Sequence, residues 1–174
     1  MAKISVTPSG RAVTFGEDEL IVSKTDLTGR ITYANDIFLK VAGYDLKDVI
    51  GSPHSMIRHP DMPRSVFKLL WDTIGAKREI FAYVVNMAKN GDHYWVFAHV
   101  TPSLDATGNV VGYHSNRRLP DPQKVATVAA LYADLRREEQ RPENRKTGME
   151  TAFQKLVDLL KEKGVSYDQF VFSI

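Results

Sequence analysis

Residues 80–102 read IFAYVVNMAKNGDHYWVFAHVTP and contain two apolar runs separated by the polar tetrapeptide KNGD. An Asn-Gly pair between apolar runs is a strong signal for a β-hairpin, because the tightest hairpin turns need positive φ at their central residues. We therefore expect strands over residues 80–85 and 93–101, joined by a turn at residues 89–92. This antiparallel pair is the centre from which the rest of the fold is inferred.

The second of these strands carries apolar side chains on both of its faces. Trp95 and Phe97 alternate with Val96 and Ala98, and successive side chains of a strand point to opposite faces of the sheet. One face covers the interior of the domain, so the other face needs a separate cover. The amphipathic segments near the end of the chain are candidates for it.

Further strands are expected on both sides of this hairpin. A turn signal at residues 105–109 precedes a strand over residues 110–116, and runs at residues 20–23 and 30–34 flank a turn that contains glycine. Because all of these connections are short, sequential strands should be neighbours in one sheet. The sequence therefore predicts five short antiparallel strands.

Helices are expected between the two hairpins. Apolar residues recur at helical spacing over residues 36–42, 46–50 and 63–75. Residues 52–63 contain three prolines and are expected to be irregular. This order of elements predicts an α+β domain in which a five-stranded antiparallel sheet has its helices gathered on one side.

We divide the chain into an N-terminal extension over residues 1–19, a domain over residues 20–119 and a C-terminal helical extension over residues 120–174. The last part contains two amphipathic helices, expected near residues 121–137 and 149–163. Their apolar faces can pack on the sheet, on a second copy of the chain to form a homodimer, or on a receptor. The pattern does not separate these alternatives.

The composition excludes several classes of protein. The 174 residues include no cysteine, which rules out disulfides, thiolate metal sites and thiol chemistry. A net charge of +2 gives no reason to expect a nucleic-acid partner. No apolar run is long enough to cross a bilayer and no signal peptide is recognisable, so we expect a cytoplasmic protein without direct membrane insertion.

No nucleotide-binding or zinc-protease motif is present, and no acid–base–nucleophile set suggests an enzyme. The densest group of reactive side chains is GSPHSMIRHPD, residues 51–61, which contains His54, Arg58, His59 and Asp61. An arginine in a proline-stiffened loop suits a phosphate or pyrophosphate group. The alternative is an Asp–Arg pair with two surface histidines.

Three more residues are open to two interpretations. Trp71 lies on the apolar face of its predicted helix, where a core position is the simplest interpretation. Asn86 and His114 lie on predicted strands, and a polar side chain that faces a core needs a hydrogen-bond partner. A bound ligand is one such partner, and water or backbone is the other.

Several motifs in this order resemble a PAS domain, in particular the flavin-binding PAS domain of bacterial aerotaxis receptors. The similarity covers about residues 20–139, and the pair RHPDMP and KNGDHYW is its most specific part. The motifs that carry it are ITYAND, VAGYDLKDVIGSPHSMIRHPDMP, KNGDHYWVFAHVTP and VGYHSNR.

The resemblance implies noncovalent binding of FAD inside the domain. In aerotaxis receptors, the residues that match Asn35, Arg58, His59 and Trp71 take part in FAD binding. The resemblance therefore implies that these four residues belong to an FAD site. In the light-sensing LOV branch of PAS domains, the residues that contact flavin or react with it match Asn86, His114 and His54. Without a thiol, the cysteine-adduct photoreaction of LOV domains cannot occur.

The functional expectation is a redox, oxygen or energy sensor that is not an enzyme and has no metal site. It resembles the small one-domain sensors of two-protein energy-taxis systems, which implies signalling through a chemoreceptor or another signalling protein. Two alternatives stay open, a haem-binding gas sensor with His54 or His59 as axial ligand and a ligand-free PAS module used for docking.

Overall fold

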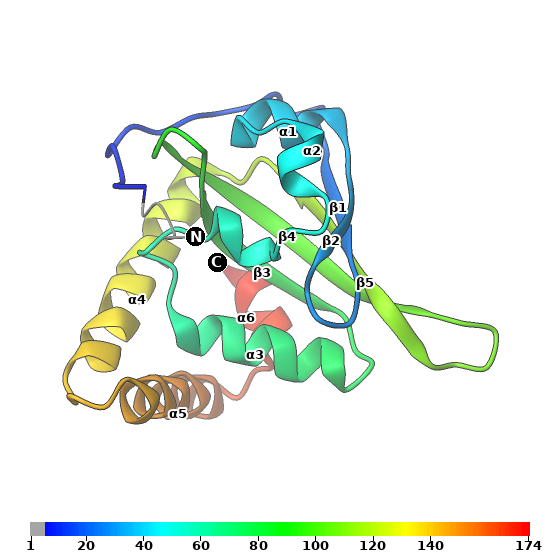
Figure 1. Ribbon diagram of the computed structural model, residues 1–174. Helices are drawn as coiled ribbons and strands as arrows, with labels where there is room; N and C mark the ends of the chain where they lie inside the picture. Colours follow the sequence, from blue (N-terminus) through cyan, green and yellow to red (C-terminus); the bar gives the residue numbers. More distant parts are fainter. Residues whose placement is uncertain (1–5) are drawn as a thin grey trace.

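The computed structural model describes residues 6–174. Its centre is one five-stranded antiparallel sheet with strand order β2-β1-β5-β4-β3 (Figure 1). The α+β class, the five strands and the C-terminal helices are confirmed. The strands are β1 (Ile21–Thr25), β2 (Ile31–Ala34), β3 (Ile80–Met87), β4 (His93–Leu104) and β5 (Val110–Arg118).

The helices form two groups. The first group lies between β2 and β3 in the chain and covers one face, which we call the inner face; the second group follows β5. The helices are α1 (Asp36–Ala42), α2 (Leu46–Val49), the 3₁₀ helix η1 (His54–Ile57), α3 (Arg64–Gly75), α4 (Pro122–Gln140), α5 (Arg145–Lys163) and α6 (Tyr167–Ser173).

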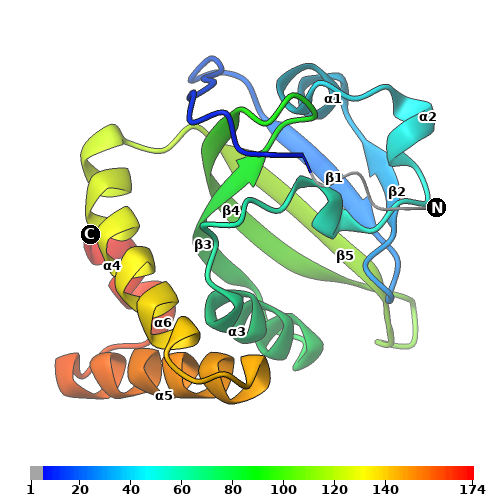
Figure 2. The ribbon, with the colours of Figure 1, turned by 60° about the vertical axis from the view of Figure 1, so that its left-hand side comes forward.

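The alternation along β3 and β4 assigns each side chain to a face. Val84 and Ala98 lie on the inner face, whereas Trp95 and Phe97 lie on the other, outer face. Tyr132 of α4 packs on Trp95 with ring centres 5.9 Å apart, and Phe172 of α6 packs on Phe97 at the same separation. The C-terminal helices therefore supply the cover that the two-sided apolar pattern required, at the β3–β4 half of the sheet (Figure 2).

The same helices cover the free edge of β3. The Tyr132 hydroxyl donates to the Tyr83 carbonyl oxygen at 2.6 Å, and the Asp168 carboxylate accepts from the Phe81 amide at 3.2 Å. An uncovered edge strand presents unpaired backbone groups that invite pairing with another chain. The apolar faces of these helices therefore pack within the chain. The helices also cover the edge of β3, where a strand of another chain could otherwise pair.

Helix α5 runs across α3 and crosses α4 at very close range (Figure 2). At Gly148 there is no room for a side chain, because a Cβ would lie 2.0 Å from the Glu139 carbonyl oxygen. Glu139 is 7% exposed, and its carboxylate accepts from the Ser65 amide at 2.8 Å and from Arg64 Nε at 3.3 Å. It thus caps the first turn of α3, where Pro63 offers no side-chain cap.

One element differs from the sequence expectation. The last residues form α6, which begins with a capping box between Ser166 and Gln169. Residues 6–19, part of the N-terminal extension, are joined to the start of β4, because Ala12 pairs with His93 and the Ser9 hydroxyl donates to the Asp92 carboxylate. Residues 1–5 of the proposed extension lie outside the described part of the chain.

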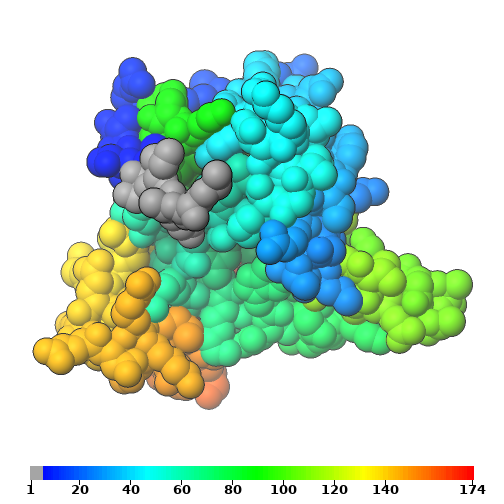
Figure 3. All heavy atoms as spheres, in the orientation of Figure 1, coloured from blue at the N-terminus to red at the C-terminus, as the bar shows by residue number. Residues whose placement is uncertain are grey.

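The β4–β5 hairpin extends beyond the rest of the sheet and projects from the body of the molecule (Figure 3). Its tip is an ordered turn in which Asp105 accepts hydrogen bonds from the Thr107 and Asn109 amides. Among residues 6–174, no helix combines the length and the apolar character that crossing a membrane requires.

Candidate ligand-binding cavity

A cavity of about 200 Å³ lies between the inner face of the sheet and the helices η1 and α3. It exceeds the roughly 150 Å³ apolar cavity that is known to hold a benzene ring, so there is room for aromatic groups. The lining residues are Ser23, Thr25, Thr28, Gly29, Pro53, His54, Ser55, Ile57, Arg58, Phe67, Leu70, Trp71, Ile74, Val84, Asn86, Ala98, Val100, Tyr113, His114, Ser115 and Arg117.

Five of the seven residues predicted to bind a cofactor belong to this lining, and Asn35 and His59 do not. Asn35 organises backbone instead. Its Oδ1 accepts from the Phe38 amide at 3.0 Å, as the N-cap of α1, and from the Val22 amide at 3.0 Å. Its Nδ2 donates to the Leu20 carbonyl at 2.8 Å. The side chain thereby joins α1 to β1.

His59 is 6% exposed and lies beside the cavity rather than in its wall. Its Nδ1 accepts from the Asp61 amide at 3.0 Å, and its ring meets the ring of His93 edge-on at 5.7 Å. Burial lowers the pKa of His59, although Asp61 opposes the shift. This histidine holds the loop before α3 and the start of β4 together.

Arg58 lines the cavity with its guanidinium stacked 4.2 Å from the centre of the Phe67 ring. Burial lowers its pKa, and the nearby Glu139 carboxylate acts in the opposite direction. A half-buried guanidinium at a cavity wall can bind two oxygens of a phosphate group through two parallel N–H···O hydrogen bonds. Asn86, 3% exposed, lies close by, because its backbone forms an isolated bridge with that of Arg58.

Arg117 is the most deeply buried charged side chain of the cavity, and the sequence analysis did not select it. It is 2% exposed, and its Nη2 donates to the Ser23 hydroxyl. Its Nε and Nη1 have no hydrogen-bond partner in the described part of the chain, and neither has the Thr25 hydroxyl on the same wall. Buried polar groups are nearly always paired, so these three atoms are available to a bound ligand or to ordered water.

His54 and Ser23 continue the polar group around Arg117. The Ser23 hydroxyl accepts from Arg117 and lies 3.2 Å from Nε2 of His54, to which it can donate its own proton. Burial, with the Arg117 charge as the second cause, lowers the pKa of His54 to about 3. The imidazole is therefore neutral at physiological pH, and the tautomer with its proton on Nδ1 would let Nε2 accept from Ser23.

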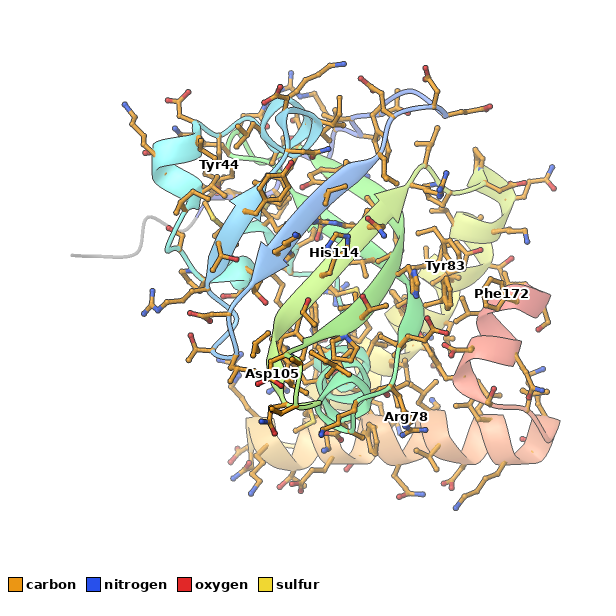
Figure 4. All side chains as sticks on the ribbon, turned by 90° about the vertical axis from the view of Figure 1, so that its right-hand side faces the viewer. Tyr44, Arg78, Tyr83, Asp105, His114 and Phe172 are labelled. Atoms are coloured by element: carbon orange, nitrogen blue, oxygen red, sulfur yellow. The ribbon has the colours of Figure 1, made fainter. Side chains whose placement is uncertain are left out.

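His114 borders the cavity only through its place on β5. Its Nε2 lies 3.0 Å from Oδ1 of Asn116, and residues two apart on a strand share a face. The register pairs Ser115 with Ser23, which puts Ser115 and Arg117 on the inner face and His114 on the outer face. Figure 4 shows His114 on the side of the sheet turned away from α3. The charged side chain that β5 contributes to the cavity is thus Arg117.

Trp71 lies where the cavity reaches the surface. It is 42% exposed, and its ring meets the ring of Tyr113 edge-on at 5.5 Å. A Cβ on Gly29 would lie 3.2 Å from the indole, and Gly29 has φ of +79°. A glycine at this turn lets the indole lie against the β1–β2 hairpin, which narrows the mouth of the cavity.

Comparisons with known proteins agree with this geometry. Residues 31–117 match the family described as the PAS fold. The chain is 42% identical over 119 residues to the aerotaxis receptor of Escherichia coli (strain K12), covering 68% of this chain and 23% of the receptor. It is 28% identical over 97 residues to the nitrogen fixation regulatory protein of Klebsiella pneumoniae, covering 56% of this chain and 20% of that protein. The chain thus spans about a quarter or less of these relatives.

Solved structures show the same fold. The light-state LOV domain of the blue-light photoreceptor Aureochrome1 superposes with a TM-score of 0.55 at 23% identity, over 67% of this chain and 91% of the other. A Light-Oxygen-Voltage domain studied with a flavin analogue superposes with a TM-score of 0.57 at 19% identity, over 66% of this chain and 86% of the other. The sheet order, the inner cavity and these similarities together place the chain in the PAS-fold family.

Proposed function

We propose that this chain is a sensor that binds FAD noncovalently in the inner cavity and reports its redox state to a partner protein. The proposal rests on a group of buried hydrogen-bond donors in the wall of a cavity wide enough for an aromatic ring. These donors, Arg117 Nε and Nη1 and the Thr25 hydroxyl, have no partner among residues 6–174. The similarity to an aerotaxis receptor supports a role in sensing.

The donor set fits a flavin. When bound, a flavin supplies reversible electron uptake, and its ring edge offers carbonyl oxygens and ring nitrogens as acceptors. Arg117, Thr25 and Asn86 would hold that edge, and Arg58 would bind the pyrophosphate that distinguishes FAD from smaller flavins. Trp71 at the mouth would cover an aromatic part of the cofactor, which is worth about 0.5–1.5 kcal/mol beyond burial.

The chain has a short physical route from the cavity to the outside. Helix α3 lines the cavity with Phe67, Leu70 and Trp71, and its first turn is held by Glu139 of α4. A change in the hydrogen bonds between the cavity residues and the ligand would shift α3. Through Glu139, this shift would alter the packing of α4 on α3. If the ligand favoured one of two arrangements of α3 and α4 by 1–3 kcal/mol, the ratio of the two arrangements would change by roughly 5- to 150-fold.

For the output we propose a chemoreceptor or another signalling protein as partner, in the cytoplasm, with no enzymatic activity in this chain. A homodimer through the C-terminal helices would have to use the surfaces that α4, α5 and α6 leave free after packing on their own domain. We also propose that the sensor domain is bounded by the N-terminal extension at residue 19 and by the C-terminal helices at residue 119.

An absorption spectrum of the purified chain tests the proposal, followed by reconstitution with FAD, FMN and haem in parallel. We expect flavin bands and tighter binding of FAD than of FMN. An intense Soret band would favour the haem sensor, and a colourless chain that takes up neither flavin nor haem would leave only a docking module. Because His59 does not line the cavity, His54 is the one lining imidazole on the helical side that haem could use.

A further inference from the structure

Arg117 carries a buried charge that no acidic side chain of residues 6–174 compensates. It forms no ion pair, whereas Arg64 pairs with Glu139 at 3.3 Å and Arg136 pairs with Asp61 at 2.6 Å. Burial lowers the pKa of Arg117 to about 10, so the guanidinium is still protonated at neutral pH. The inner face therefore holds a full positive charge that is 2% exposed.

The groups around this charge are all neutral. Ser23 accepts one of its hydrogen bonds, and the Phe38 ring lies 5.2 Å from the guanidinium carbon. His54 is uncharged at physiological pH, and burial raises the pKa of Tyr94 far above its usual value. Hydrogen bonding to one hydroxyl and contact with one ring recover only part of what a guanidinium loses when it leaves water.

A buried charge without a counter-charge is rare in proteins, because its desolvation is costly. Residues 6–174 do not supply this partner, so we expect a ligand to supply it by reaching Nε and Nη1, which have no partner among these residues. We propose that Arg117 is the ligand-binding residue that makes the cavity select a planar ring with electron-rich acceptors, and that stabilises negative charge on that ring. This inference rests on the proposed function.

Three measurable consequences follow if the ligand, and not the protein, compensates Arg117. Removing the charge should make the ligand-free chain more stable, whereas removal of a structural arginine makes a protein less stable. The same removal should weaken binding of the ligand. It should also weaken binding of the reduced, more electron-rich form more than that of the oxidised form.

The experiment compares Arg117→Met, which removes the charge, with Arg117→Lys, which keeps it. Arg118→Met is the matched control, because Arg118 is the next residue of β5 and is exposed on the other face. Urea unfolding of the ligand-free chains is followed by circular dichroism, and FAD binding by fluorescence quenching. The midpoint potential of each FAD-loaded chain is measured by spectroelectrochemistry.

For Arg117→Met we expect a folding constant of the ligand-free chain at least about fivefold larger than that of the wild type. We also expect FAD affinity to fall by tenfold or more. A tenfold loss of preference for the reduced form would lower the midpoint potential by about 30 mV for a two-electron couple. The midpoint potential of Arg117→Lys should stay close to that of the wild type, because lysine keeps the positive charge. Arg118→Met should match the wild type in every measurement.

The outcomes separate this inference from the proposed function. If the wild-type chain takes up no flavin, the proposed function is wrong, and a less stable or unfolded Arg117→Met chain would in addition show that Arg117 is structural. If the wild type binds FAD and Arg117→Met binds it with unchanged affinity and potential, this inference alone is overturned.

Discussion

The two faces of the central sheet are built in opposite ways. On the outer face, aromatic side chains of β3 and β4 pack on Tyr132 and Phe172 of the chain's own C-terminal helices. On the inner face, small side chains such as Ser23, Ala98 and Ser115 leave a cavity of about 200 Å³. Several polar atoms in its wall have no partner among the residues that the structure describes.

The difference shows which surface the protein completes by itself. Polar groups at the outer face and at the edge of β3 are paired, as in the bond from the Tyr132 hydroxyl to the Tyr83 carbonyl. At the inner face, donor groups of Arg117 and Thr25 have no acceptor within the described part of the chain. A change on the outer face should therefore cost stability, and a change on the inner face should alter ligand binding and the response to pH.

The largest effect is expected from breaking the outer face at Tyr132. Tyr132→Ala removes a ring that is 3% exposed and its hydrogen bond to β3, and should lower the free energy of unfolding by about 3–5 kcal/mol. Tyr132→Phe keeps the ring and should cost about 1–2 kcal/mol. Urea denaturation measures both, and a loss below 1 kcal/mol for the alanine variant would show that α4 does not cover this face.

The next largest effect concerns the inner face in acid. The unfolded chain protonates His54 near pH 6.5, whereas the folded chain resists protonation until about pH 3. The unfolded state thus binds more protons in this window, so the stability present above pH 6.5 is lost as the pH falls towards 3. We expect His54 to account for about 2–3 kcal/mol of the loss at pH 4.

Carboxylates with lowered pKa, such as Asp92 and Asp26, also lose stability as the pH falls, so the wild-type curve alone does not isolate His54. The comparison is with His54→Gln, whose free energy of unfolding should change less between pH 7 and pH 4. Parallel curves for the two chains would mean that His54 reaches solvent and is protonated in the folded state.

A smaller effect is expected where the two groups of helices meet. Glu139→Ala removes the acceptor of the Ser65 amide and the ion pair with Arg64, and should cost about 2 kcal/mol. Glu143→Ala, at an exposed position shortly after α4, is the control and should change the stability by less than about 0.5 kcal/mol. If the two variants were equally stable, the Glu139 contact would not couple α3 to α4, and the proposed route between these helices would be wrong.

Much of this architecture could be predicted because its signals are local. The KNGD turn and the alternation around Trp95 determine the central hairpin, and the spacing of apolar residues determines α3. Helix α6 was not predicted, although Ser166 and Gln169 form a readable capping box. A seven-residue helix gives too short a periodic pattern to recognise by spacing alone.

The site was harder to predict because faces depend on contacts distant in the sequence. A period of two along residues 110–118 separates His114 from Arg117, but only the pairing with β1 decides which of them faces the helices. Arg117 is the last residue of the motif VGYHSNR, so the signal lay within a stretch already selected. Family resemblance likewise marked Asn35 without showing that its side chain bonds to backbone.

The smallest expected effect is the sharpest test of the two faces, because it uses neighbouring positions of one strand. His114→Ala removes a partly exposed side chain whose one hydrogen bond in the described structure goes to Asn116 on the outer face. Its stability should change by less than about 0.5 kcal/mol, and FAD uptake should equal that of the wild type.

Ser115→Leu, one residue along, adds a large side chain to the inner face and should reduce FAD uptake because it occupies the cavity. If His114→Ala lost FAD and Ser115→Leu kept it, the register of β5 would be shifted by one residue and the assignment of the two faces reversed.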